Sequence, residues 1–245
     1  MNDSSTIWYH NGSKHGMEEL REVVKLSRVT HVFLWALHPH DVRSSHWQEH
    51  VKLCKDNKIK VVWCRSLFAM YGGTLGPLNE IKDMWSIKYL VNALRTVQAE
   101  AKQIGADYTA FELEPYANSP LKPIFFGETK LTRWQWLRMR FARWIACRLA
   151  GHVDFVLPAG TNVPRHPYSV YRLLCRKGGK ITWHTYWEDP PSVYYDYDIP
   201  AYYFDIEKGD KGKYLPSQIN EIPKPAMIFT YENALEVAKA IAEVK

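Results

Sequence analysis

Short apolar runs that suit β-strands recur along the chain, and segments with the 3.6-residue spacing of a helix separate most of them. We expect eight strands, at Thr6–His10, His31–His38, Lys60–Leu67, Ala106–Glu114, Val153–Pro158, Ile181–Trp187, Ala201–Asp205 and Ala226–Tyr231. The expected helices are Met17–Ser27, His46–Asp56, Asn79–Ile104, Thr132–Leu149, Pro167–Arg176 and Glu232–Val244. The links after the sixth and seventh strands are rich in Pro, Tyr and Lys and are expected to be short or irregular.

Strand–helix alternation indicates a parallel sheet. Eight repeats in 245 residues match the α/β (β/α)8 TIM barrel, whose usual length is about 250 residues. An open doubly wound sheet is the alternative, but the first turn carries no GxGxxG and no P-loop occurs in the chain. No linker or break in composition is visible, so we expect one barrel domain over residues 1–245.

The fourth strand carries two acids near its end. Side chains two apart on a strand share a face, so Ala110, Glu112 and Glu114 face one way while Phe111 and Leu113 face the other. Two carboxyl groups so close together repel each other and are hard to desolvate. Flanking aromatics suggest that they do not lie open in water, which is typical of a site that moves protons.

Active sites of this fold lie at the carboxyl ends of the strands. Polar and aromatic residues gather at those ends, and the fourth is their centre. The set comprises His10, His38 with His40 and Asp41, Arg65, Glu112 with Glu114, His184 with Tyr186 and Trp187, Asp205, and Tyr231 with Glu232.

Composition adds aromatic content and a positive charge. The chain has 10 Trp and 15 Tyr, which stack well on sugar rings, and a net charge of +6. The densest basic cluster lies in the helix expected at Thr132–Leu149, whose apolar residues fall on one stripe. Its five arginines are spread around the helix, so we interpret them as solvated groups with packed stems rather than as a contact for nucleic acid.

The four cysteines form no CxxC pair and no zinc spacing, and we interpret them as small buried residues in a reducing compartment. No signal peptide and no membrane span is visible. We therefore expect a cytoplasmic or phage-associated protein with no membrane contact, and no cofactor or metal.

The fourth strand resembles that of the barrel glycoside hydrolases. In one large clan, Asn-Glu-Pro at this strand end carries the acid/base and a Glu at the seventh strand end is the nucleophile. Here Glu114 and Pro115 match, Leu113 stands in place of the Asn, and Asp205 in place of the second Glu. This resemblance implies a carboxylate pair whose separation decides between retention, at about 5–5.5 Å, and inversion, at about 6.5–9.5 Å.

A second resemblance is to the chitinase-like hydrolases, in which acids alternate along the fourth strand. Asp107, Ala110, Glu112 and Glu114 stand at those places, with Glu112 in place of an Asp and Ala110 in place of the middle acid. This pattern implies that the substrate's acetamido group attacks, oriented by the acid two residues before the catalytic Glu. Tyr186, on the sixth strand, matches a tyrosine that assists.

Both resemblances give Glu114 the same role, which is to protonate the leaving glycosidic oxygen with a raised pKa. Glu112 helps to raise that pKa. The expected catalytic residues are therefore Glu114, Glu112 and Asp205. The expected substrate contacts are Tyr186, His184, Trp187, Tyr231, Arg65 and His38, with Tyr186, Trp187 and Tyr231 stacking on the sugar. A basic surface suits an anionic glycan such as peptidoglycan of the cell wall.

Three alternatives stay open. His38-Pro-His40, with other polar strand ends, suits a metal-dependent hydrolase or isomerase on the same barrel. A non-catalytic carbohydrate-binding barrel keeps the stacking aromatics without the chemistry. Nucleic-acid binding has only the net charge and the arginine-rich helix in its favour. A steep decrease of DNA affinity with added salt would support it.

Overall fold

The structure is a computed structural model of the whole chain. It describes residues 6–12, 16–36, 45–67, 85–113, 131–158, 172–184, 199–206, 213–222, 224–230 and 233–244. Most of the expected strands fall within these ranges, while several expected strand ends do not.

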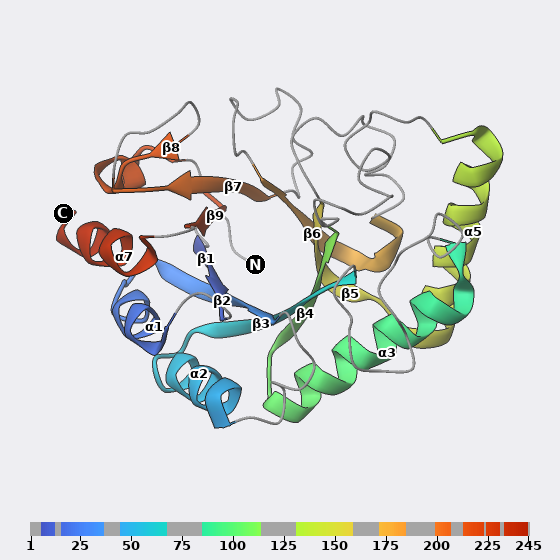
Figure 1. Cartoon of the computed structure of the whole chain (residues 1–245), viewed down its shortest axis with the longest axis horizontal. Helices are drawn as coiled ribbons and strands as arrows, with labels where there is room; N and C mark the ends of the chain where they lie inside the picture. Colours follow the sequence, from blue (N-terminus) through green and yellow to red (C-terminus); the bar gives the residue numbers. More distant parts are fainter. Residues whose placement is uncertain are drawn as a thin grey trace.

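Eight parallel strands close into a barrel (Figure 1). They pair in the order β1-β2-β3-β4-β5-β6-β7-β9, and β9 returns to β1. The pair that closes the ring between β6 and β7 brings His184 beside Ala201. The ring consists of β1 (Thr6–Asn11), β2 (Val29–Ala36), β3 (Lys60–Ser66), β4 (Tyr108–Leu113), β5 (Val153–Pro158), β6 (Cys175–His184), β7 (Ile199–Phe204) and β9 (Ala226–Phe229).

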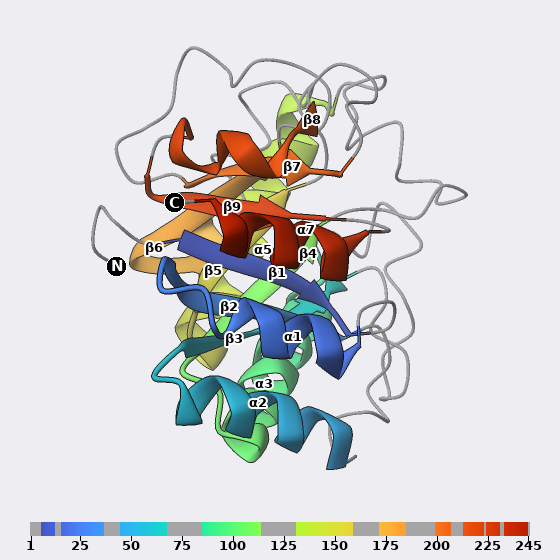
Figure 2. The ribbon, with the colours of Figure 1, turned by 90° about the vertical axis from the view of Figure 1, so that its left-hand side faces the viewer.

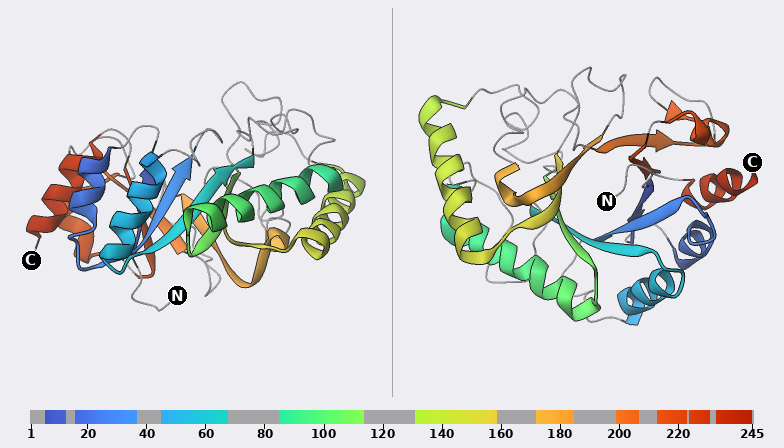
Figure 3. Two further views of the ribbon diagram at one scale, coloured as in Figure 1. Left: turned by 90° about the horizontal axis from the view of Figure 1, so that it is seen from below. Right: turned by 180° about the vertical axis from the view of Figure 1, so that it is seen from behind.

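Helices surround the barrel in the order α7, α1, α2, α3 and α5, each beside the next (Figures 2 and 3). The short strand β8 (Lys213–Tyr214) lies against the end of β7. The helical elements are α1 (Met17–Val23), α2 (Ser45–Asp56), α3 (Ile87–Ile104), α5 (Arg133–Ala150), α7 (Ala234–Glu243), and the short 3-10 turns η4 (Arg172–Leu174) and η5 (Pro216–Asn220). The expected (β/α)8 fold is confirmed.

One expected helix is absent from the described part of its segment, so that prediction is wrong there. Residues of the segment Pro167–Arg176 form only the short turn η4 before Cys175 begins β6. The helix expected from Asn79 begins at Ile87, because the side chain of Ser86 caps it by accepting a hydrogen bond from the Tyr89 N–H. Residues 79–84 lie outside the described part.

The strands divide the core into two layers. Side chains that face the helices include Trp63 and Phe111, and those of the other face fill the barrel interior. The predicted alternation along β4 is confirmed, because Phe111 and Leu113 pack under the helices and Ala110 packs inside. The interior cluster contains Ile7, Tyr9, Phe33, Val62, Cys64, Ala110, Phe155, Leu157, Ile199, Ala201, Met227 and Phe229.

Two buried glutamates join strands to the helices that cover them. The indole N–H of Trp8 on β1 donates to Glu19 on α1 at 2.6 Å. The indole N–H of Trp63 on β3 donates to Glu100 on α3 at 2.8 Å. Each helix therefore presents one carboxylate inward, and each carboxylate has a strand partner that offsets its desolvation.

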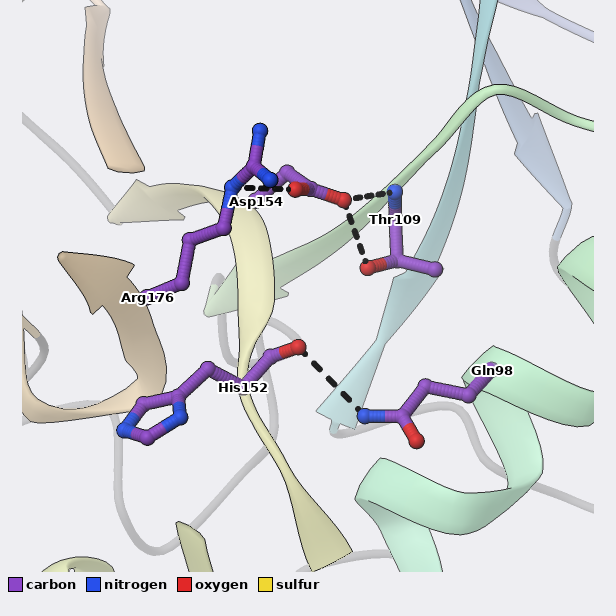
Figure 4. A network of polar contacts seen from close by, with 5 residues as sticks. All are labelled: Gln98, Thr109, His152, Asp154 and Arg176. Atoms are coloured by element: carbon purple, nitrogen blue, oxygen red, sulfur yellow. Dashed lines mark hydrogen bonds and ion pairs between the residues drawn. The ribbon is translucent and has the colours of Figure 1, made fainter. Parts of the chain in front are cut away.

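Aspartates join neighbouring strands near the amino-terminal end of the barrel. Asp107 accepts the backbone N–H of Val61 on β3 at 2.9 Å. Asp154 on β5 accepts both the backbone N–H and the hydroxyl of Thr109 on β4, and it pairs with Arg176 on β6 at 2.7 Å (Figure 4). At this end of a barrel such contacts serve stability rather than chemistry.

The helix α5 turns its largest apolar side chains outward. Its buried face consists of Met139, Ala142, Arg143, Ala146 and Cys147. The arginines of α5 are solvated as expected, except Arg143, which is only 2% exposed. In the described residues, no helix has both the length and the apolar character needed to cross a bilayer.

All four cysteines are buried and free, which confirms the prediction that they are small buried residues.

Candidate functional site

Glu112 lies inside the barrel at the carboxyl end of β4. Its carboxyl group is buried, with the residue only 7% exposed, and Oε1 accepts a hydrogen bond of 3.2 Å from the hydroxyl of Tyr9 on β1. Ser66 of β3 stands beside it in the strand register. The predicted placement of an acid on the interior face is therefore present at Glu112, at the end of the barrel where this fold carries its chemistry.

Aromatic rings line the barrel around this carboxylate. The ring of Tyr9 lies 4.6 Å from that of Phe229, and Tyr203 lies 6.3 Å from Phe229 on the other side. Trp35, beside Cys64 in the register of β2 and β3, packs against the same interior cluster. The described residues therefore set one fixed carboxylate against an apolar wall inside the barrel.

Trp35 also has an unpaired donor. Its indole nitrogen is buried and has no hydrogen-bonding partner within the described structure. An unpaired buried N–H costs free energy, and such groups in native proteins call for an explanation.

The thiol of Cys64 is held neutral. Complete burial raises its pKa well above the ordinary value, and the charge of Glu112 raises it further. A protonated thiol is a poor nucleophile and a poor metal ligand. Cys64 therefore serves as packing under Glu112 rather than as a reactive group.

Asp205 follows β7 and is 9% exposed. Its Oδ1 accepts hydrogen bonds from the Ile206 backbone N–H at 2.8 Å and from the Asn233 amide at 2.9 Å. Asn233 occupies the N-cap position of α7 and uses its side chain to bond Asp205, so Asp205 ties the end of β7 to the segment after β9. Its predicted catalytic role stays a prediction.

Arg65 and His10 lie on the opposite side of the strands from Glu112. Arg65 is 1% exposed, its Nε lies 3.3 Å from Glu100, and its Nη1 donates to the Ala36 carbonyl at 2.7 Å. His10 lies 3.4 Å from Glu19 on α1. The alternation that places Glu112 inside the barrel places both of these under the helices, so the structure does not bring them to the candidate site.

Five predicted site residues lie outside the described part of the chain. They are Glu114, His38, Tyr186, Trp187 and Tyr231. For His184 the structure describes the backbone at the end of β6, beside Ala201 of β7. In the described residues, no group of three or more His, Cys, Asp or Glu is placed to hold a metal ion.

Sequence reasoning missed Tyr9 and Trp35. Both lie within predicted strands and on the face that alternation assigns to the interior, which is the only signal that the sequence contains for them. The contact between Tyr9 and Glu112 depends on which strands face each other across the barrel.

Comparison with known proteins supports the barrel fold of the chain and assigns it to no family. No protein-family profile and no curated protein matches the sequence. Solved structures with the same fold include D-psicose 3-epimerase of Clostridium cellulolyticum, with 10% identity, 98% of this chain and 91% of the other covered, and a TM-score of 0.53.

A sugar phosphate isomerase/epimerase of Parabacteroides distasonis has 11% identity, covers 98% of this chain and 97% of its own, and gives a TM-score of 0.54. The pneumococcal virulence factor StrH has 10% identity, with 98% and 82% covered and a TM-score of 0.53. At sequence identities this low, the similarity shows a shared fold and no more.

Proposed function

We propose that this protein is a glycoside hydrolase that uses two acids of the fourth strand, Glu112 and Glu114. The observation that carries the proposal is the buried carboxylate of Glu112 inside the barrel, held by the Tyr9 hydroxyl. General acid catalysis at a glycosidic oxygen requires a protonated carboxyl group, and a fixed carboxylate two residues away along the chain favours that protonation.

Glu114 follows Glu112 by two positions and is the proposed proton donor. Glu112 holds the substrate next to it, and its charge disfavours ionisation of a second acid nearby, which keeps a proton on the donor. Trp35 supplies an indole N–H and a ring face to the sugar. Asp205 is the proposed second carboxylate, and the stereochemistry of the product tests that role.

The likeness to StrH, described as an exo-β-D-N-acetylglucosaminidase, favours an N-acetylated sugar as substrate. This choice agrees with the chitinase-like arrangement of acids. Chitin oligomers and peptidoglycan fragments are therefore the first substrates to offer.

The decisive experiment compares glycan hydrolysis by the wild type with that by Glu114→Gln and Glu112→Gln. Glu236→Gln, the same change at an exposed position of α7, is the matched control. We expect hydrolysis by the wild type and the control, with loss in both fourth-strand variants while they stay folded. Hydrolysis that survives Glu114→Gln would contradict the proposal.

A sugar isomerase or epimerase is the second candidate. The fold likeness to D-psicose 3-epimerase and to the sugar phosphate isomerase/epimerase favours it. A carboxylate such as Glu112 would then move a proton next to a carbonyl group. Interconversion of free ketoses, with no glycan hydrolysed, would select this activity over the first.

A further inference from the structure

The exposed face of α5 concentrates the large apolar side chains of the surface. In the part of the chain that the structure describes, six large apolar residues are exposed, and five of them lie on this one helix. Trp134 is 75% exposed and Phe141 59%. The five residues, which we call the α5 face, are Trp134, Leu137, Phe141, Trp144 and Leu149.

The buried side of the helix explains this orientation. Ala142 and Ala146 belong to the buried side, and small residues allow close packing against the neighbouring helix α3. The bulky residues consequently point away from the barrel, where α5 forms the outer edge of the molecule (Figures 1 and 3). At 1.5 Å per residue the face is about 22 Å long.

The charge around the α5 face has one sign. Arg133, Arg138, Arg140 and Arg148 are exposed, and the helix contains no Asp or Glu. The guanidinium of Arg148 lies 5.3 Å from the centre of the Trp144 ring. Trp, Phe and Leu together with arginines are the composition of helices that lie in the interface of an anionic bilayer.

A hollow opens at the start of the helix. It has a volume of about 560 Å³, and its lining includes Thr132, Trp134, Gln135 and Arg138. One cation and one indole beside an open hollow suit the anionic headgroup of a phospholipid.

We propose that the α5 face docks the protein on the surface of an anionic lipid membrane, with the apolar side chains between the headgroups and the arginines on the phosphates. A second copy of the chain fits this face less well, because two such helices would set arginines against arginines with no acid between them. Nucleic acid fits less well, because bases could stack on the three aromatic rings but would leave Leu137 and Leu149 without an apolar partner.

The test is co-sedimentation with vesicles of phosphatidylcholine alone and of phosphatidylcholine mixed with phosphatidylglycerol. We expect binding to the anionic vesicles only, weakened by added salt. Trp134→Ser/Phe141→Ser and Arg138→Gln/Arg148→Gln should each weaken that binding at least about tenfold. Lys88→Gln/Lys239→Gln removes the same charge from exposed sites on α3 and α7 and should leave it unchanged.

All changed residues are exposed, so thermal unfolding should stay the same in each variant. Lack of binding to anionic vesicles, or equal loss in the Lys88/Lys239 control, would overturn the proposal. A dimer that dissociates in Trp134→Ser/Phe141→Ser would assign the face to a second copy instead, and RNA binding lost in the arginine variant would assign it to nucleic acid. Hydrolysis of a soluble glycan should be unaffected, which separates this proposal from the enzymatic one.

Discussion

The hydroxyl of Tyr9 donates to Oε1 of Glu112 at 3.2 Å, and this contact joins β1 to β4 across the barrel interior. The two strands are not neighbours, because β2 and β3 lie between them in the ring. The hydrogen bond therefore fixes the carboxylate relative to the far wall of the barrel.

Tyr9→Phe should lower kcat/KM about tenfold, since the ring stays against Phe229 while the carboxylate loses its positioning donor. The cost in the free energy of unfolding should be about 1 kcal/mol. Tyr89→Phe is the matched control, because its hydroxyl donates to the Leu67 carbonyl under the helices. Steady-state kinetics and urea unfolding measure both, and an equal loss of activity in the control would remove the assigned role of Tyr9.

Trp35→Phe tests the unpaired indole. A phenyl face is retained, while the donor and part of the ring volume are lost, so we expect KM to rise about fivefold with little change in kcat. Trp47 also has a buried indole nitrogen without a partner in the described structure, but it packs under the helices against Trp63. Trp47→Phe should therefore affect stability and leave KM alone. An unchanged KM in Trp35→Phe would mean that substrate does not reach this donor.

Gly12→Ala should destabilise the fold by about 1–3 kcal/mol, because a Cβ there would lie 1.9 Å from the Trp47 ring. That ring stands edge-on to Trp63 with 5.1 Å between centres, so it has little room to move. Gly16→Ala is the control, since its Cβ would meet nothing closer than 4.0 Å. The control should cost less than about 1 kcal/mol, for a weaker helix cap. Equal costs in thermal unfolding would contradict the packing argument.

His50 should make stability depend on pH. Burial lowers its pKa to about 4 and outweighs the hydrogen bond that its Nδ1 donates to the His46 carbonyl, which acts to raise the pKa. The folded protein therefore holds His50 neutral. Unfolding returns the pKa to about 6.5, so the stabilisation is complete above that pH and is lost as pH falls toward 4. Between pH 6.5 and pH 4 the free energy of unfolding should fall by about 2–3 kcal/mol less in His50→Gln than in the wild type.

His31 has a pKa lowered to about 4 in the same way and remains in that variant, so a shallower slope rather than a flat one is expected. Urea unfolding at a series of pH values gives both slopes. Parallel curves for wild type and His50→Gln would show that folding does not lower the pKa of His50.

Arg65→Met should cost about 3–5 kcal/mol, because it leaves the Glu100 carboxylate buried without its cation. Burial already raises the pKa of Glu100, and Arg65 is the group that opposes this rise most. Adding Glu100→Gln should restore part of the loss, since the amide oxygen still accepts from Trp63. The double variant should keep its kcat/KM, and a large loss there would return Arg65 to the substrate site.

The sequence determined the eight-strand barrel and the interior position of Glu112, because strand alternation and a period of two are local properties of the chain. It did not determine that Tyr9 meets Glu112, because that contact depends on how far apart two strands stand in a closed ring. It did not determine that Arg65 meets Glu100 on α3, because that contact depends on which helix covers the strand; the predicted substrate contact of Arg65 stays a prediction.

For α5 the sequence showed an apolar stripe, and only the tertiary structure decided that this stripe faces outward. The reason is that Ala142 and Ala146 allow a closer approach to α3 than Trp134 or Phe141 would, so the small face is buried and the bulky one exposed. Local pattern thus determines which residues share a face, and packing against the rest of the molecule decides where that face points.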